Sequence, residues 1–342
     1  MPAASTFTAE LEAKVAQQLR SQRVGYLLGA GSSYLDGTGY PLAFELWDKI
    51  KDRITNVTER ADIQAKLDDG AEGIEQALDL LDLGQPVEGS HRHSVTSAIA
   101  DLFEPLTPSL DAHVEFVKRI GQRSDPCVKI FGLNYDPLLE RAAERARVRL
   151  IDGFLGHEHA FFNSAVFSET PLQHRGPRAK PSLHPAGVPV HLYKLHGSLG
   201  WYDCPQRGVC RSGFAGPLPT GMTRLMVPPQ RRKVSEVTRP TYSPLWTAFR
   251  GAMSLDPKPL MRLVAVGYGF LDEHVNDVVD SALARPDFRL LIFAKELSDT
   301  AWARWSTKTN TIVFTEQRCA VEGTAGPGHT HLWKFERLTR EV

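Results

Sequence analysis

The chain has 342 residues, and its 40 lysine and arginine residues balance 40 aspartate and glutamate residues, so its formal charge is zero. This balance excludes the strongly basic surface of a dedicated nucleic-acid-binding protein, and the sequence gives no strong sign of direct nucleic-acid binding. The four cysteines are sparse and irregularly spaced. We expect a cytoplasmic protein without a membrane segment, because neither a signal sequence nor a long apolar run is present.

A predicted first strand runs directly into a glycine turn. The strand covers Val24 to Leu28, after an amphipathic helix with apolar residues from Phe7 to Leu19. The turn, Gly29-Ala30-Gly31-Ser32-Ser33, offers backbone amides that could face a phosphate. The common dinucleotide fingerprint would need a third glycine where this chain has Tyr34. An ordinary dehydrogenase is therefore disfavoured, and a tight turn without a ligand stays open.

We interpret residues 59–122 as a helical insert, and residues 1–58 and 123–342 as the core domain. Apolar residues recur at helical spacing through the insert, for example at Ile74 and Leu78. The insert could cover one side of a binding site or provide an assembly surface.

Two polar residues follow the next predicted strand, Val128 to Phe131. Asn134 and Asp136 stand between this strand and a helix that begins at Pro137. Both residue types cap helices well, so helix capping and catalysis both remain open on the spacing alone.

The stretch before the following strand is irregular. Val148 to Phe154 predicts a short strand, and a proline-spaced loop from Pro171 to Pro189 comes after it. A long loop of this kind could act as a lid.

His196 follows the predicted strand Val188 to Leu195 and precedes Gly197-Ser198. A lone histidine is more often structural, but this one stands at a strand end, where functional side chains gather. Because the carboxyl ends of parallel strands meet at one crevice of an open α/β sheet, we expect Asn134 and His196 to lie together. Trp201-Tyr202 could wall the resulting pocket.

The C-terminal third predicts a second glycine turn. Leu263 to Val266 forms a strand that enters Gly267-Tyr268-Gly269-Phe270, and Asp272 and Asn276 follow at a predicted helix start. Amides and a carboxylate at such a place could hold a ribose. Further predicted elements are strands at Leu290–Phe293 and Thr311–Phe314, a helix at Ala301–Trp305, a turn at Gly323–Gly328 and an edge strand at His331–Phe335.

These motifs occur in an order that resembles the sirtuin-like family. The first glycine turn is followed by Gly39-Tyr40-Pro41, Asn134-Tyr135-Asp136, Lys194-Leu195-His196-Gly197-Ser198, and Gly267-Tyr268-Gly269-Phe270 with Asp272-Glu273-His274-Val275-Asn276. The chain is most similar to the bacterial branch that hydrolyses NAD in anti-phage defence, rather than to the zinc-containing protein deacylases. The resemblance implies an α/β fold, a Rossmann-like open parallel sheet with helices on both faces and a helical insert.

The resemblance also implies roles for individual residues. Asn134 and His196 would be the catalytic pair, with Asp136 directed toward the carboxamide of nicotinamide. The first glycine turn would contact the pyrophosphate of NAD, and the second would contact the ribose on the adenosine side. The expected NAD-binding residues are Gly29, Ala30, Gly31, Ser32, Ser33, Tyr40, Pro41, Gly197, Ser198, Gly267, Tyr268, Gly269, Asp272 and Asn276. NAD would be the substrate, and no metal is expected.

Two departures separate the chain from the deacylase pattern. Leu42-Ala43-Phe44-Glu45 lacks the Phe-Arg pair that follows the Gly-x-Pro motif in deacylases, so no residue is assigned to the nicotinamide ribose there. Cys204 and Cys210 stand where deacylases carry a zinc module of two Cys-x-x-Cys pairs, but no second pair is in range. This departure argues against a peptide substrate.

We therefore predict an NAD hydrolase that releases nicotinamide and ADP-ribose. The bond to C1′ breaks through an oxocarbenium-like state, so the protein needs mainly positioning, a held water and suitably placed polar groups. Asn134 could orient the water, and His196 could accept a proton because imidazole has an ordinary pKa of about 6.5. An NAD-dependent deacylase and a non-catalytic nucleotide-sensing module are the alternatives.

Unrestrained NAD cleavage would harm the cell, so we expect the activity to be held back. We predict a homo-oligomer, with the insert or the loop from Pro171 to Pro189 as the restraining part. The resemblance implies a defence partner such as a HerA-type ATPase or an Argonaute-like module.

Overall fold

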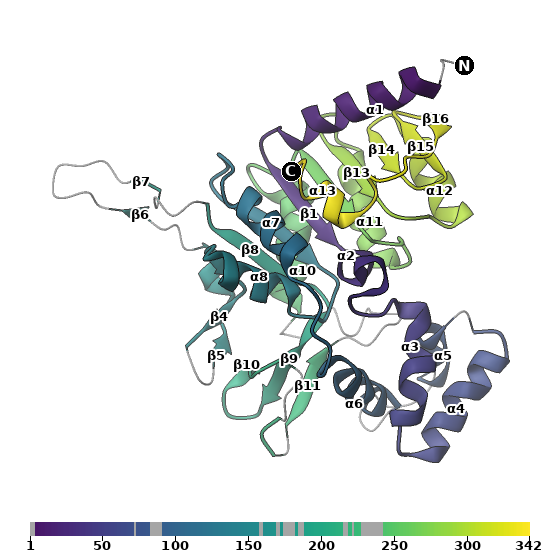
Figure 1. Cartoon of the computed structure of the whole chain (residues 1–342). Coiled ribbons are helices and arrows are strands. Elements are labelled where there is room, and N and C mark those ends of the chain that lie inside the picture. The colour runs from purple at the N-terminus through teal and green to yellow at the C-terminus, as the bar shows by residue number, and fades with distance from the viewer. Residues whose placement is uncertain are drawn as a thin grey trace.

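The computed structural model describes residues 4–71, 73–82, 91–156, 160–168, 172–173, 182–183, 188–214, 218–220, 222–226 and 242–342. A nine-stranded sheet forms the centre of the protein (Figure 1). Its strands, in spatial order, are β16 (Thr324–Pro327), β15 (Arg318–Val321), β14 (Thr311–Phe314), β13 (Arg289–Phe293), β12 (Arg262–Val266), β1 (Val24–Leu28), β2 (Val128–Gly132), β8 (Val190–Lys194) and β3 (Leu150–Ile151). The strands from β14 to β3 in this order run parallel, and β15 and β16 add an antiparallel edge.

The central strands are short apolar runs that are buried on both faces, as expected for a parallel sheet covered by helices. From β1 the chain proceeds outward to β2 and β8, and it later returns to place β12 on the other side of β1. In register, Leu28 at the end of β1 pairs with Gly132 of β2 and with Val266 of β12. The direction of winding thus reverses between β1 and β12, which is where open α/β sheets bind ligands.

Helices cover both faces of this sheet. On one face, α1 (Ala4–Leu19), α7 (Asp111–Ile120), α8 (Leu138–Ala146) and α13 (Phe335–Leu338) pack against side chains such as Tyr26 of β1. On the other face, α10 (Ser243–Arg250), α11 (Glu273–Leu283) and α12 (Asp299–Ser306) pack against side chains such as Leu27. Alternate residues of β1 therefore belong to two different cores. The predicted α/β fold with helices on both faces is confirmed.

A helical layer lies beyond the carboxyl end of the sheet (Figure 1). It consists of α3 (Ala43–Ile50), α4 (Val57–Asp68), α5 (Ile74–Leu81) and α6 (His91–Phe103), which share a third apolar core. In this packing α3 joins the helices of the predicted insert, whereas α7 lies on the sheet beside α8. The division into residues 1–58 and 123–342 against 59–122 stays a prediction.

A second, smaller sheet contains β9 (Gly197–Cys204), the strand that begins directly after His196. The order of this sheet is β11 (Thr223–Met226), β9, β10 (Gly208–Arg211), β5 (Ala160–Phe162) and β4 (Phe154–Leu155). A short hairpin is formed by β6 (Leu172–Gln173) and β7 (Ser182–Leu183). Short helical turns are α2 (Gly31–Tyr34), η1 (Leu35–Gly37), η2 (Lys51–Arg53), η3 (Ser164–Ser168) and η4 (Gly251–Leu255). The predicted lid loop, 171–189, lies outside the described residues except for this hairpin and residues 188 and 189.

Three predicted elements differ from the structure. The strand predicted from Val148 to Phe154 is divided between β3 and β4 of different sheets, because Gly153 turns the chain with a φ of +91°. The turn predicted at 323–328 is mostly β16, since Glu322 and Gly323, both at positive φ, make a tight hairpin after β15. The predicted edge strand 331–335 is a turn that leads into α13. No helix in the described part of the chain is both long and apolar enough to cross a membrane.

Candidate active site

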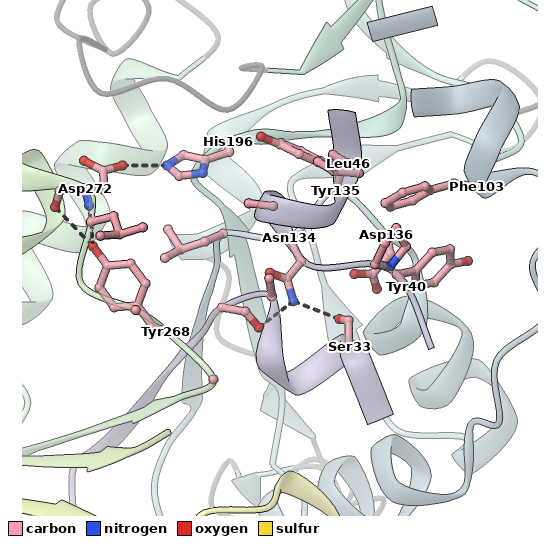
Figure 2. Close-up of a pocket in the computed structure, with 18 residues that line it drawn as sticks. Ser33, Tyr40, Leu46, Phe103, Asn134, Tyr135, Asp136, His196, Tyr268 and Asp272 are labelled. Carbon is pink, nitrogen blue, oxygen red and sulfur yellow. Dashed lines mark hydrogen bonds and ion pairs between the residues drawn. The ribbon is translucent and has the colours of Figure 1, made fainter. Parts of the chain in front are cut away.

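A pocket opens at the carboxyl ends of β1, β2, β8 and β12, between the large sheet and the helical layer (Figure 2). The predicted site residues that line it are Gly29, Ala30, Ser33, Tyr40, Pro41, Asn134, Asp136, His196, Gly267, Tyr268, Gly269 and Asp272. The other predicted site residues, Gly31, Ser32, Gly197, Ser198 and Asn276, are not among the described residues that line it. Strand ends far apart in the sequence thus contribute to one cavity.

The two glycine turns touch each other through their backbones. The amide of Gly31 donates to the carbonyl of Gly267 at 2.9 Å, and the amide of Gly29 donates to the carbonyl of Val266 at 2.9 Å. A Cβ atom added at Gly29 or at Gly31 would lie 2.7 Å from backbone atoms of residues 267 and 268. These glycines are therefore required for the close approach of the turns, whatever ligand binds.

Most amides of the first turn are engaged within the protein. Besides those of Gly29 and Gly31, the amides of Ser32 and Ser33 donate to the carbonyls of Gly29 and Ala30, each at 3.0 Å. A phosphate at this turn would share these donors with the internal bonds. The pyrophosphate contact stays a prediction.

Asn134 is tied to the first glycine turn. Its Nδ2 lies 2.9 Å from the carbonyl oxygen of Gly29 and 2.8 Å from Oγ of Ser33. Asp136, by contrast, accepts a hydrogen bond from the amide of Leu138 at 3.0 Å, in the first turn of α8. Asp136 thus supports the start of α8 and also lines the pocket, whereas Asn134 projects across the pocket wall toward the glycine turn (Figure 2).

His196 and Asp272 form a buried pair. His196 Nε2 lies 3.1 Å from Asp272 Oδ2, and each residue is no more than 7% exposed. Behind His196, the indole of Trp246 donates to the carbonyl of Leu195 at 3.2 Å. Sequence reasoning assigned Asp272 to a ribose and missed this contact with His196.

Lys194, at the end of β8, is a buried cation. It is 3% exposed, and its Nζ lies 2.5 Å from the carbonyl oxygen of Asp136 and 2.8 Å from Oε1 of Glu140. Nζ also lies 3.3 Å from Oγ of Ser198 at the start of β9. The ammonium therefore ties the loop that carries Asn134 to the segment that carries His196. A lysine at the end of a buried strand was the sequence signal for such a role.

The aromatic wall of the pocket comes from the helical layer. Tyr40 stacks on Phe103 with ring centroids 4.6 Å apart, and both line the pocket with Leu46. Burial raises the pKa of the Tyr40 phenol and nearby Asp136 raises it further, so the phenol stays protonated. Trp201 and Tyr202, which were predicted to wall this pocket, are not among the described residues that line it. Trp201 packs against Phe154 and Phe162 of the smaller sheet instead. Phe44, from the segment that lacks the Phe-Arg pair of deacylases, is 75% exposed.

Cys204 and Cys210 are buried together on the hairpin of β9 and β10. They form a small apolar cluster with Tyr202, and burial, with Cys204 nearby, raises the pKa of the Cys210 thiol. Cys127 and Cys319 belong to the large sheet region instead. Among the described residues, no group of three or more histidine, cysteine or acidic residues is arranged to hold a metal ion.

Comparison with known proteins finds one matching family and solved structures of low sequence identity. The family model of the SIR2-like domain matches residues 128–313. One similar solved structure is a mutant Sir2 homologue in complex with 2′-O-acetyl ADP ribose, with 15% identity, a TM-score of 0.37 and 96% of each chain covered. Another is a mutant Sir2 homologue in complex with ADP ribose, with 14% identity, a TM-score of 0.42 and the same 96% coverage of each chain. No curated protein matches the sequence.

Proposed function

The chain belongs to the SIR2-like family, and we propose that it hydrolyses NAD to ADP-ribose and nicotinamide. The observation that carries the proposal is the convergence of Asn134, Asp136 and His196 in one pocket. This pocket lies where the direction of winding reverses, between β1 and β12. An amide, a carboxylate and an imidazole from two separate strand ends meet there beside two glycine turns. This set provides positioning and proton transfer, which are the two needs of the reaction.

NAD would lie across the carboxyl ends of the strands. Its pyrophosphate would face the turn from Gly29 to Ser33, and its adenosine ribose would lie toward the turn that begins at Gly267. The nicotinamide would then reach Asp136, where the stacked rings of Tyr40 and Phe103 offer an apolar surface to a planar ring.

The chemistry needs no group beyond these side chains. The C1′–N bond breaks with its electron pair going to the nicotinamide nitrogen, and water adds to the oxocarbenium carbon. Asn134, whose Nδ2 is engaged by the glycine turn, would orient that water through its amide oxygen. His196 would accept the proton that the water loses. The products are ADP-ribose, neutral nicotinamide and one proton.

Two alternatives remain, and one experiment separates all three. The purified protein is incubated with NAD, with and without an acetylated peptide, and the products are resolved by chromatography. Hydrolysis gives nicotinamide and ADP-ribose without peptide, a deacylase gives nicotinamide and acetyl-ADP-ribose only with peptide, and a sensing module gives neither. The placement of Cys204 and Cys210 in an apolar cluster favours hydrolysis over deacylation, since a four-cysteine zinc module would need both thiols as ligands.

We also propose that the enzyme acts in bacterial anti-phage defence as a restrained homo-oligomer. The helical layer supports assembly because it exposes the large apolar side chains of Phe44, Val57 and Leu80. A defence partner such as a HerA-type ATPase or an Argonaute-like module could use the same surface. Light scattering with a nicotinamide-release assay tests the idea, and a monodisperse monomer with fast turnover would disprove it.

A further inference from the structure

The pair of His196 and Asp272 joins two motifs that are 76 residues apart. His196 stands at the junction of β8 and β9, and Asp272 stands at the start of α11. Figure 2 shows the His196 ring between Asp272 on one side and Asn134 and Tyr135 on the other. Because both side chains are buried and both line the pocket, the contact lies inside the proposed active site.

Asp272 is held firmly by its own motif. Its Oδ1 accepts from the amide of His274 at 3.0 Å and so caps α11, while Oδ2 faces His196. Its backbone amide donates to the Tyr268 hydroxyl at 3.2 Å. Asn276 donates from Nδ2 to the carbonyl of Phe270 at 2.9 Å. The polar groups of this motif thus bind one another and fix the carboxylate in place.

We propose that Asp272 is a positioning residue for His196 rather than a ribose ligand, an inference that rests on the proposed NAD hydrolysis. A carboxylate only accepts hydrogen bonds, so the hydrogen of the neutral imidazole lies on Nε2. The lone pair then lies on Nδ1, which takes the proton from the attacking water. The same carboxylate stabilises the imidazolium that results, as in other enzymes where a buried aspartate orients a histidine base.

The two roles of Asp272 predict different kinetics. A ribose ligand contributes to the affinity for NAD and for ADP-ribose. A positioning residue acts through His196, so its loss lowers turnover and leaves affinity in place. Since the carboxylate also caps a helix, a useful variant must retain the cap.

Asp272→Asn is such a variant. Asparagine caps helices as well as aspartate does, and in this chain Asn56 already caps α4 by accepting from the amides of Thr58 and Glu59. Ser298→Ala is the matched control, because it removes the cap of α12, where Ser298 accepts from the amide of Ala301, without touching the pocket. For parent and variants we would measure kcat, KM for NAD, Kd for ADP-ribose by calorimetry, and Tm.

The expected result for Asp272→Asn is a fall in kcat of about 100-fold or more. We expect KM and Kd to change by no more than about twofold and Tm to stay at the parent's value. Ser298→Ala should lower Tm and leave kcat unchanged. A variant of Asp272 that keeps kcat but loses affinity for ADP-ribose would overturn the proposal in favour of the ribose contact.

A second measurement is independent of turnover. The ¹⁵N chemical shifts of the His196 ring, assigned by comparison with His196→Gln, report which nitrogen carries the hydrogen. The Nε2–H form is expected in the parent, and loss of that preference is expected in Asp272→Asn. An Nδ1–H form in the parent would overturn the proposal. If the parent releases no nicotinamide, the proposed function fails while the ring tautomer still tests the pairing.

Discussion

Asn134 donates its side-chain amide to the carbonyl oxygen of Gly29 at 2.9 Å, across 105 residues of sequence. The bond joins the end of β2 to the first glycine turn, and Ser33 accepts from the same nitrogen. The residue proposed to orient water therefore also fixes the turn proposed to face the pyrophosphate. Its two tasks are separable by experiment, because one affects turnover and the other affects stability.

Replacing Asn134 or His196 by alanine should reduce NAD cleavage by about 100-fold or more, since loss of one transition-state contact costs roughly 3 kcal/mol. Asn134→Ala should in addition lower the free energy of unfolding by about 1 kcal/mol, the net value of a typical hydrogen bond. Nicotinamide release and urea unfolding provide the two measurements. A folded variant of either residue that cleaves NAD at the parent's rate would show that the assigned pair is wrong.

The central strands, and the meeting of polar residues at their ends, could be predicted from sequence. Short apolar runs such as Val24 to Leu28 and Thr311 to Phe314 coincide with β1 and β14. A strand that is buried on both faces is mostly apolar along its whole length, without the alternation of apolar and polar residues seen in a half-exposed strand. Polar residues that follow such runs, Asn134 and His196 among them, meet because parallel strands share one carboxyl edge.

The pairings within the site could not be predicted. The contact between His196 and Asp272 depends on how two loops pack, and no local periodicity reports it. Burial of Lys194 likewise depends on the distant carboxylate of Glu140. The sequence placed Trp201 and Tyr202, which follow His196, at the aromatic wall, whereas Tyr40 and Phe103 line the pocket there.

Gly31→Ala should destabilise the protein by about 2 kcal/mol, because the new Cβ would lie 2.7 Å from the backbone of Gly267 and neither turn can yield freely. Gly269→Ala is the matched comparison. Among the described residues, its Cβ would meet Leu271 alone, at 3.8 Å, so its cost should stay below about 1 kcal/mol. Urea unfolding of both variants measures the difference, and equal losses would contradict the close contact of the two turns.

Removal of metal ions should change neither Tm nor NAD cleavage. Cys204 and Cys210 pack against Tyr202 in an apolar cluster, and a structural zinc would need two further ligands at the same place. Because a structural zinc contributes directly to folding, its loss would lower Tm clearly. Melting curves with and without a strong chelator give the answer, and a chelator-induced drop would reverse our interpretation of these thiols.

Lys194→Met should destabilise the protein by about 3 kcal/mol, because it leaves the Glu140 carboxylate without its buried cation. Glu140→Gln in the same chain should restore part of this loss, since a neutral amide costs less to bury than a lone carboxylate. A double-mutant cycle followed by urea unfolding measures the coupling. Strictly additive losses would show that the ion pair does not stabilise the loop that carries Asn134.

Acid should destabilise the protein through His113. This residue lies on α7, is 1% exposed, and its ring centroid is 4.6 Å from that of Phe335. Burial lowers its pKa from 6.5 to about 3. Between those two values the unfolded chain binds a proton that the folded chain does not, so the free energy of unfolding falls as pH falls below 6.5. At pH 5 the loss should be about 2 kcal/mol.

His113→Leu should remove this part of the pH dependence. His191 is a second contributor, because burial, with Lys129 nearby, lowers its pKa to about 4. The parent, a variant of each of these two histidines alone and a variant of both would be unfolded in urea at pH 8 and at pH 5. We expect the stability of His113→Leu relative to the parent to be about 2 kcal/mol greater at pH 5 than at pH 8. If the stability of His113→Leu relative to the parent is the same at pH 5 and at pH 8, His113 takes up its proton in the folded state. The contact of α7 with α13 would then have to open in mild acid.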